Sequence, residues 1–446
     1  MKLKTFKAGV HPQYNKELAS SSSISPIKPF PSKLSIPMSQ HLGGPSEPLV
    51  KRGDEVAIGQ LIGKATGSMG VNIHSPVFGK VSKVLPKPLV GGKMANYIEI
   101  DVDVEKTSNF VWQKTNVNIS SLSKPEIINR IKEAGIVGLG GATFPTHIKY
   151  SVPEGKVIDT LIINGAECEP YLTCDHRLML EKAEEIIKGI EIVAKLFPLK
   201  NIYIGIENNK SDAIAVFNEA IKSSKLNITV SALKTKYPEG AEKMLIKAIT
   251  KRVVPSLKLP LDIGVVVSNV GTIYSIYEAF YFNKPLIDRV VTISGDLVKK
   301  GLNILAPIGT PFENLVSLVE LTSPEIYKVV VGGPMMGVAV PTIDYTVTKG
   351  TCGILLLSEK ISKAFDETPC IKCGSCAKSC PMGLMPFNLA AYTKAKKFDI
   401  VKNYNAFDCI ECGCCSYVCP AKIDIVGWIR YAKNYIKATQ NKNNGK

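Results

Sequence analysis

The sequence predicts a multidomain α/β protein that begins with a β barrel-sandwich domain and ends with a cysteine-rich α-helical module. Three observations lead to this prediction. At about 150 residues per domain, 446 residues suffice for about three domains. Residues 119–286 alternate strand and helix patterns, which is typical of a mostly parallel sheet covered by helices. Nine of the 12 cysteines lie between Cys370 and Cys419, which adds a fourth, smaller module.

Composition excludes several classes of protein. Hydrophobic residues make up 45% and charged residues 21% of the chain, which excludes disordered, collagen-like and coiled-coil proteins. The longest uncharged apolar run, Ile263 to Tyr277, has 15 residues, fewer than the ~20 that a membrane helix needs. The first residues have no apolar core. We therefore expect neither a transmembrane segment nor a signal peptide.

The first domain is expected to span residues 1–118. Ser20 to Pro37 is rich in Ser and Pro and is interpreted as a loop. Residues 50–63 and 74–81 alternate in hydrophobicity between Gly turns, which predicts hairpins. The two hairpin units resemble the barrel-sandwich fold of biotinyl and lipoyl domains. No Lys lies between Thr66 and His74, where such domains are modified, so we expect no covalent prosthetic group.

The second domain is expected to span residues 119–286. Ser123, Pro125 and Glu126 form a capping box that predicts a helix ending at Gly135. The elements expected after it are strands at 157–163, 201–206, 227–233 and 264–267, and helices at 178–197, from 211, and at 239–250.

The remaining chain is expected to form two smaller domains. Residues 287–360 contain short strand patterns at 290–295, 328–334 and 353–357, which predict a small β-rich domain. Residues 361–432 hold the clustered cysteines. A polar tail, residues 433–446, follows them.

The cysteines form an internal repeat. A Cys-x2-Cys-x2-Cys-x3-Cys-Pro run starts at Cys370 and recurs 39 residues later at Cys409. This run is typical of bacterial ferredoxins, in which the fourth Cys of each run ligates the other cluster. We therefore assign one 4Fe–4S cluster to Cys370, Cys373, Cys376 and Cys419, and a second to Cys409, Cys412, Cys415 and Cys380.

Structural zinc is the alternative for these thiols. Zinc sites use four ligands in one tetrahedron and usually show two separated Cys-x2-Cys pairs, often with His. Neither the triple spacing nor the final Cys-Pro fits that pattern. Cys414 lies outside the repeat and is interpreted as a bystander thiol.

Polar loops in the second domain predict a ligand cleft. The Gly-rich segment 138–149 is not a P-loop, and Thr143 stands where G-x-G-x-x-G requires Gly. By itself it predicts either a turn or a loop that lets the backbone approach a ligand closely. Acidic and polar segments at 164–177, 237–242 and 268–272 adjoin the ends of expected strands or helices. Because parallel sheets bind ligands at the carboxyl ends of strands, these loops could share one cleft.

Two of these segments carry a family resemblance. Gly138-x-Gly-Gly-Ala-x-Phe-Pro-Thr-x-x-Lys149 and Asn164-x-x-Glu-x-Glu-Pro170 are similar to the flavin and NADH site of the NADH-oxidising subunit of respiratory complex I. Over residues 1–432 the chain resembles the RnfC family, peripheral members of ion-pumping ferredoxin:NAD oxidoreductase (Rnf) complexes. Gly9-Val-His11-Pro12, Pro37-x-x-Gln40-His41-x-Gly43 and the domain order carry this wider resemblance.

The resemblance implies a Rossmann-like FMN/NADH domain, a β-grasp (SLBB-like) third domain and a two-cluster ferredoxin domain. It also implies noncovalent FMN and NAD(H) as ligands. Phe144 would stack on NADH, and Glu169 and Glu242 would bind NADH hydroxyls, with Gly240 beside them. The residues expected around FMN are Gly138, Gly140, Gly141, Lys149, Asn164, Glu167, Ser268, Asn269 and Thr272. The chain departs from the complex I pattern at Leu139, Thr143, Ala166 and Ser268, so the FMN phosphate and ribose contacts should differ.

The implied function is hydride exchange between NAD(H) and FMN, coupled to one-electron transfer through two 4Fe–4S clusters, without a side chain acting as acid or base. The implied partners are the other membrane and iron–sulfur subunits, indirectly ferredoxin, and an anionic membrane surface on the cytoplasmic side. The net charge of +16 is not accompanied by a basic–aromatic motif, so no nucleic-acid partner is expected. The alternatives are a cobalamin reductase-type protein, which shares these modules in another order, and a non-catalytic electron-relay subunit.

Overall fold

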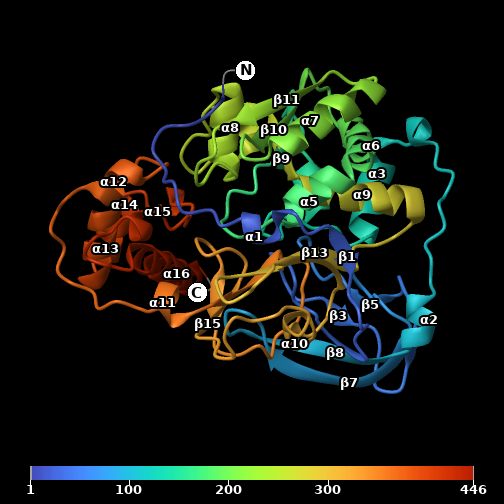
Figure 1. Cartoon of the computed structure of the whole chain (residues 1–446). Coiled ribbons are helices and arrows are strands. Elements are labelled where there is room, and N and C mark those ends of the chain that lie inside the picture. Colours follow the sequence, from blue (N-terminus) through green and yellow to red (C-terminus); the bar gives the residue numbers. More distant parts are fainter. Residues whose placement is uncertain (1–2, 445–446) are drawn as a thin grey trace.

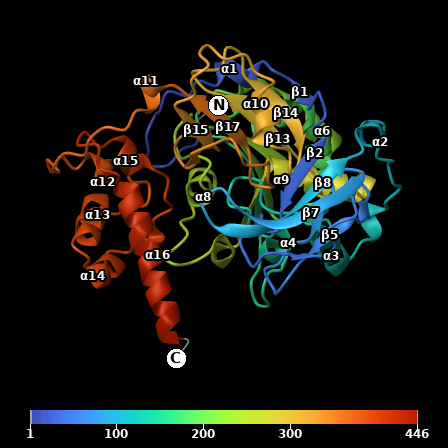
Figure 2. The ribbon, with the colours of Figure 1, turned by 90° about the horizontal axis from the view of Figure 1, so that it is seen from below.

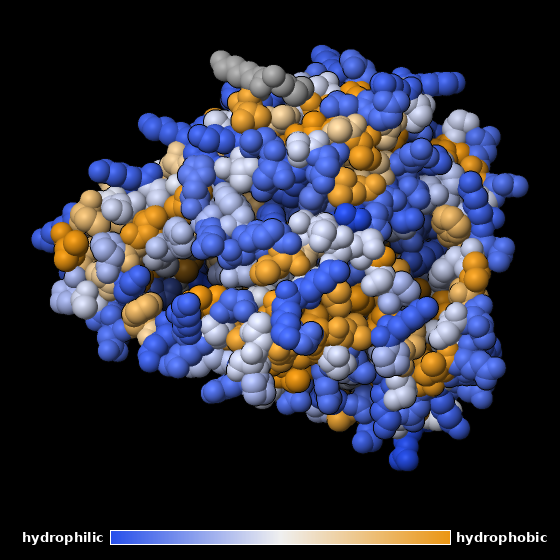
Figure 3. Space-filling model, viewed as in Figure 1, coloured by the Kyte–Doolittle hydropathy of each residue, from blue (hydrophilic) through white to orange (hydrophobic). Residues whose placement is uncertain are grey.

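The computed structural model describes residues 3–444, with side chains up to Gln440. Successive parts of the chain form separate groups of sheets and helices (Figure 1). Hydrophilic side chains cover much of the face seen in Figure 3, with smaller apolar groups between them. Within the described residues, none of the helices combines the length and apolarity needed to cross a bilayer.

The N-terminal sheets are antiparallel. One has the order β2-β8-β7-β4 and the other β3-β5-β6. Their core side chains, among them Ile36, Ile62 and Ile98, are fully buried. The strands are β2 (Lys33–Pro37), β3 (Glu47–Pro48), β4 (Glu55–Val56), β5 (Leu61–Lys64), β6 (Ile73–His74), β7 (Gly79–Pro88) and β8 (Met94–Val102), followed by α2 (Val104–Ser108).

The second sheet system is parallel, with the order β11-β10-β9-β12. Strands β10 and β11 lie on one side of β9 and β12 on the other, so the strand order reverses between β9 and β12, where parallel sheets bind ligands. The strands are β9 (Thr160–Gly165), β10 (Asn201–Glu207), β11 (Ile228–Leu233) and β12 (Val265–Asn269).

Helices cover this sheet. The predicted capping box of Ser123 and Glu126 begins α3. The helix expected at 178–197 is instead two helices, because Lys182 leaves the helical conformation (φ −135°, ψ 29°) between them. The helices are η1 (Ile119–Ser121), α3 (Lys124–Glu133), α4 (Thr146–Tyr150), α5 (Cys174–Glu181), α6 (Ala183–Ala194), α7 (Ser211–Ala220), η2 (Ile221–Ser223), α8 (Glu242–Thr250), η3 (Pro260–Ile263) and α9 (Val270–Phe282).

The third region forms a six-stranded sheet, β1-β14-β13-β17-β15-β16. Its edge strand β1 (Ile24–Pro26) comes from the N-terminal part of the chain and pairs in parallel with β14. The prediction of a loop at residues 20–37 was therefore wrong, because β1 and β2 both lie within that range. The other elements are β13 (Asp288–Ser294), β14 (Leu302–Pro307), α10 (Phe312–Val316), β15 (Lys328–Val331), β16 (Val338–Val340) and β17 (Gly353–Leu357).

Residues 3–31, which we call the N-terminal strap, run across several regions. The strap contains α1 (Glu17–Ser20) and β1. Bridges join Lys4 to Leu233 and Val10 to Tyr237 in the α/β region. The Gly9 amide donates to the Ser379 carbonyl in the cysteine module (2.9 Å). The strap therefore connects parts of the chain that are far apart in sequence.

The cysteine module is helical and has its own core, which includes Leu389, Val401 and Ile429. It lies at one side of the molecule, and α16 runs along it as one long helix (Figure 2). Residues 433–444 belong to α16, although they were expected as a polar tail; residues 445 and 446 lie outside the described residues. The helices are α11 (Glu359–Ser362), α12 (Ser375–Ser379), α13 (Pro386–Lys394), α14 (Phe398–Asn403), η4 (Ala406–Asp408), α15 (Cys414–Tyr417) and α16 (Ile425–Asn444).

A buried lysine joins three regions. Lys349 is 0% exposed, and its ammonium nitrogen donates to the carbonyls of Asn72 and Gly135, both at 2.7 Å. Its amide donates to Gln40 Oε1 (3.0 Å). Burial lowers the pKa of Lys349 to about 7. One side chain thus holds the barrel-sandwich region and the α/β region against the third region.

We expect Lys349→Met to lower the melting temperature, because two buried carbonyls lose donors and each unsatisfied group costs about 1–3 kcal/mol. The deficit should grow from pH 7 to pH 10. In that interval Lys349 is protonated in the unfolded chain, where its pKa is ~10.4, and deprotonated in the folded chain. Because the unfolded chain binds more protons, the stability of the wild type rises with pH. Exposed Lys360 provides the control substitution Lys360→Met, which should leave the melting temperature unchanged. Equal melting curves for the wild type and Lys349→Met would contradict this prediction.

Candidate functional site

A cavity of about 450 Å³, which we call the large cavity, lies at the carboxyl ends of β9 and β12. Of the 13 residues predicted to bind cofactor, Gly141 alone is absent from its lining; it is exposed and has a φ of +107°. The structure therefore brings together twelve predicted residues from four segments: Gly138, Gly140, Phe144, Lys149, Asn164, Glu167, Glu169, Gly240, Glu242, Ser268, Asn269 and Thr272.

The Gly-rich loop is held rigidly at one wall. The Leu139 amide donates to Thr272 Oγ1 (2.9 Å), and the guanidinium of buried Arg289 donates to the Leu139 carbonyl (3.2 Å). The Gly138 amide donates to the Phe144 carbonyl (2.8 Å), which folds the loop back on itself. Thr272 thus positions the loop, besides lining the cavity. A fixed backbone with few side chains is suited to close contact with a flat ring.

An ion pair lies in the cavity wall. Lys149 on α4 contacts Glu242 at the start of α8, with 2.8 Å between Nζ and Oε1, and donates to the Val267 carbonyl (3.0 Å). Both side chains are about one-third exposed. The pair joins α4, α8 and β12, and it presents both a cation and a carboxylate to a bound ligand.

The carboxylate of Glu167 already has partners within the protein. Its carboxylate accepts from the amides of Asp175 (2.7 Å) and His176 (3.3 Å) in the first turn of α5, and it lies 3.8 Å from the ammonium of Lys16. Burial raises the pKa of Glu167 to about 7. Asp175, in turn, accepts from the Asn269 side chain (2.6 Å). The Glu167 carboxylate therefore fixes the acidic segment against the first turn of α5.

Glu169 links the cavity to other regions. Its two oxygens accept from the Tyr237 hydroxyl (3.3 Å) and from the Met335 amide (3.0 Å). Burial raises the pKa of Glu169 to about 6. Tyr237 also donates to the carbonyl of Cys412 (2.8 Å), inside the second cysteine repeat.

Residues outside the predicted set also line the cavity. Some of them lie within segments that the sequence had already singled out; these include Cys168, Leu172, Cys174 and Asp175 in the acidic segment and Tyr237 in the 237–242 segment. Others come from separate regions that only the tertiary fold brings together, and no local signal marks them. These are Met336, Cys352 and Ile410.

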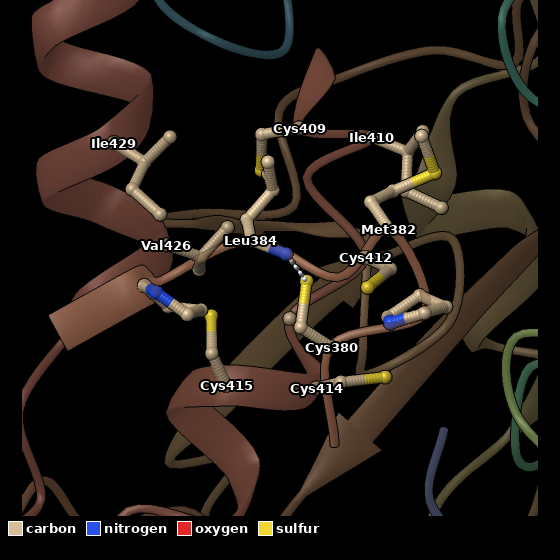
Figure 4. A pocket seen from close by; sticks show the side chains of 13 residues that line it. Cys380, Met382, Leu384, Cys409, Ile410, Cys412, Cys414, Cys415, Val426 and Ile429 are labelled. Atoms are coloured by element: carbon tan, nitrogen blue, oxygen red, sulfur yellow. Dashed lines mark hydrogen bonds between the residues drawn. The ribbon is translucent and has the colours of Figure 1, made fainter. Parts of the chain in front are cut away.

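The eight repeat cysteines surround two further cavities, with four at each. Cys370, Cys373, Cys376 and Cys419 line one of them. Cys380, Cys409, Cys412 and Cys415 line the other (Figure 4), and Cys414, which is not part of the repeat, lines it as well. These are the two sets that we assigned, with the fourth cysteine exchanged between the runs. Among the side chains that the structure describes, no three Cys, His, Asp or Glu residues are grouped closely enough to hold a single metal ion.

The surroundings of the second set suit an iron–sulfur cluster. The amides of Leu384 and Glu411 donate to the sulfurs of Cys380 and Cys409, each at 3.4 Å. Hydrogen bonds to sulfur and burial are the usual means by which proteins set the potential of such clusters. The first set differs in exposure, because Cys370 and Cys373 are exposed whereas Cys412 and Cys415 are buried.

Ile410 lines both the large cavity and the cavity of the second set. It lies between two cysteines of that set, Cys409 and Cys412. The loop that carries these cysteines is therefore a wall shared by the two cavities.

Family models match three stretches of the chain. The RnfC barrel sandwich hybrid domain matches residues 4–105, the Nuo51 FMN-binding domain residues 131–278, and the 4Fe-4S dicluster domain residues 369–423. The C subunit of the proton-translocating ferredoxin:NAD(+) oxidoreductase complex of Clostridium ljungdahlii is 44% identical, over 98% of this chain and 95% of the relative. This chain belongs to the RnfC family.

Other members of the family agree with this assignment. The C subunit of the Na(+)-translocating ferredoxin:NAD(+) oxidoreductase complex of Acetobacterium woodii is 43% identical, over 99% of both chains. The C subunit of the ion-translocating oxidoreductase complex of Rhodobacter capsulatus is 39% identical, over 98% of this chain and 84% of the relative. The predicted barrel-sandwich, FMN-binding and two-cluster domains are thereby confirmed, as are FMN and 4Fe–4S clusters as cofactors. Matches over nearly the whole chain favour RnfC over the cobalamin reductase alternative.

We expect Cys380→Ala and Cys370→Ala to damage different clusters. Because Cys380 lies with Cys409, Cys412 and Cys415, its loss should remove or alter the EPR signal of that cluster and leave the other signal intact. Cys370→Ala should have the reciprocal effect. EPR of the dithionite-reduced variants measures both results.

Cys414→Ala is the matched control, because this thiol lines the cavity of the second set but does not belong to the repeat. Both signals and about eight irons should remain. Loss of the same signal in Cys370→Ala and Cys380→Ala would show instead that each run ligates its own cluster.

Proposed function

We propose that the chain oxidises NADH, or reduces NAD⁺, in the large cavity and exchanges the electrons singly with its partner subunits through two 4Fe–4S clusters. The observation that carries this proposal is the wall shared at Ile410, which places the Cys409–Cys412 loop directly against the cavity. Bound FMN supplies the exchange between hydride and single electrons.

The residues of the cavity divide into two groups. The Gly138–Gly140 backbone and the residues at the ends of β9 and β12 would hold FMN. In that group Asn164 donates to the Gly240 carbonyl (2.8 Å) and Ser268 bonds to the Tyr150 hydroxyl (2.6 Å), so the FMN side is braced by the protein. Phe144, Glu169 and Glu242 would bind the dinucleotide, the carboxylates by accepting from its hydroxyl groups.

The two cluster sites would act in series. The set that includes Cys409 adjoins the large cavity, and its four cysteines are buried or half-buried, so it would exchange electrons with that cavity. The set that includes Cys370 and Cys373 has exposed cysteines, so it would face the next protein of the complex. Exposed Ile371 and Phe365, each 68% exposed, lie in the same segment and would form part of that contact.

The proposal also covers the fold of two domains and the place of the chain in the cell. The parallel β9–β12 sheet and its helices support a Rossmann-like domain, and the mixed sheet of the third region supports a β-grasp (SLBB-like) domain. We place the chain on the cytoplasmic face of a membrane complex as a peripheral subunit. NADH and, through other subunits, ferredoxin would be its redox partners.

Glu169→Ala should abolish or strongly reduce NADH-dependent dye reduction, because the dinucleotide loses a buried acceptor. Both clusters should still be reduced by dithionite and give unchanged EPR intensities. Asp101→Ala, at an exposed site on the barrel sheet, is the control and should keep full activity. Normal activity of Glu169→Ala would refute the role proposed for Glu169, whereas purified wild-type protein that binds no flavin would favour a non-catalytic relay subunit.

The order of the clusters can be tested with the two cysteine variants. In Cys370→Ala, NADH should still reduce the remaining cluster, which adjoins the cavity. In Cys380→Ala, NADH should reduce the remaining cluster much more slowly than dithionite does, because the connecting cluster is damaged. Rapid-freeze EPR after mixing with NADH measures both rates. Equal rates in the two variants would contradict electron transfer through the two clusters in series.

A further inference from the structure

Tyr237 stands between the large cavity and the cysteine repeat. Its side chain lines the cavity and is 1% exposed. The hydroxyl group lies 2.8 Å from the Cys412 carbonyl and 3.3 Å from Glu169 Oε1. The first acceptor belongs to a predicted cluster ligand, and the second to a residue that would bind the dinucleotide.

The surroundings of Tyr237 fix it in this place. Its backbone N–H and C=O are both paired with Val10, at 2.9 and 2.8 Å. Val10, Cys168, Cys412 and Cys414 pack with Tyr237 in one buried apolar cluster. The second oxygen of Glu169 is held by the Met335 amide, so the carboxylate is fixed as well. The oxygen atoms thus have little freedom, and the hydroxyl proton is the part of this contact that can reorient.

A tyrosine hydroxyl has one proton and can donate it to one acceptor at a time. An ionised carboxylate is a stronger acceptor than a carbonyl, whereas the shorter distance favours the Cys412 carbonyl. The two acceptors therefore compete for one proton. A dinucleotide hydroxyl that donates to Glu169 would weaken that carboxylate as a competitor and leave the Tyr237 proton to Cys412.

We infer that Tyr237 is a positioning residue through which occupation of the dinucleotide site raises the reduction potential of the cluster held by Cys380, Cys409, Cys412 and Cys415. A hydroxyl proton directed at the Cys412 carbonyl brings positive charge toward the cluster and stabilises its reduced form. The cluster thus becomes a better electron acceptor when the dinucleotide is bound. This inference rests on the proposed function and adds to it a link between the two sites.

ADP-ribose is the probe, because it carries both ribose groups of the dinucleotide and no nicotinamide, so it cannot transfer hydride. The potential of this cluster is measured by EPR-monitored redox titration of the full chain with and without ADP-ribose. The charge of ADP-ribose acts on the wild type and on Tyr237→Phe alike. The difference between their ligand-induced shifts therefore isolates the hydroxyl group. We expect the wild-type shift to be more positive.

Tyr14→Phe is the matched control. It removes another buried tyrosine hydroxyl, one that has no hydrogen-bond partner among the described residues. This variant should give the wild-type shift. Equal shifts in the wild type and Tyr237→Phe, or a Tyr14→Phe result that matches Tyr237→Phe, would overturn the inference.

Glu169→Gln gives a second readout if Tyr237→Phe does not fold. Its amide can donate to the Tyr237 oxygen, and the Tyr237 proton would then go to Cys412 without any ligand. Because loss of the carboxylate charge raises the potential by itself, the readout is the shift that saturating ADP-ribose induces in each protein. We expect this shift to be smaller in the variant than in the wild type, because the Tyr237 proton is already directed at Cys412; an equal or larger shift would also overturn the inference. Failure of the proposed function looks different, because NADH would then reduce neither cluster in the wild type.

Discussion

The contact between the α/β region and the second cysteine repeat determines how the rest of the molecule works. Electrons cross a protein efficiently only over short distances, so the cavity and a cluster must adjoin each other. The Tyr237–Cys412 hydrogen bond and the buried apolar cluster around it hold the Cys409–Cys415 loop against the cavity. From α16, Lys433 also donates to the Cys409 carbonyl (3.0 Å) and braces the loop from its other side. The loop is thus held from both the cavity and the module.

Much of the fold and of the candidate site could be predicted from local patterns. The capping box at Ser123 and the strands that precede the polar loops depend on neighbouring residues alone, and the structure has them close to where they were expected. The reversal of strand order between β9 and β12 then explains why twelve predicted residues meet at one cavity. The repeat spacing predicted both cysteine sets, because the exchange of the fourth ligand is a property of the motif.

What could not be predicted depends on contacts between distant segments. Strand β1 has only three residues and gains its place by pairing with β14, some 280 positions later. Lys349 in a β-rich region gave no sign of being buried, since its acceptors are backbone carbonyls of two other regions. Similarly, Ile410 is an ordinary residue between two cysteines until the fold places it in the cavity wall.

The N-terminal strap has a consequence for how the chain matures during synthesis. Its partners emerge from the ribosome in the order of the sequence: Leu233 and Tyr237, then β14, and last Ser379. Domains generally fold as units while synthesis proceeds, yet this segment has to wait for most of the chain. Ser379 is the last residue of α12 and lies directly before Cys380, so the final contact forms beside a predicted cluster ligand. Metallation and the closing step of folding are therefore joined at the same few residues.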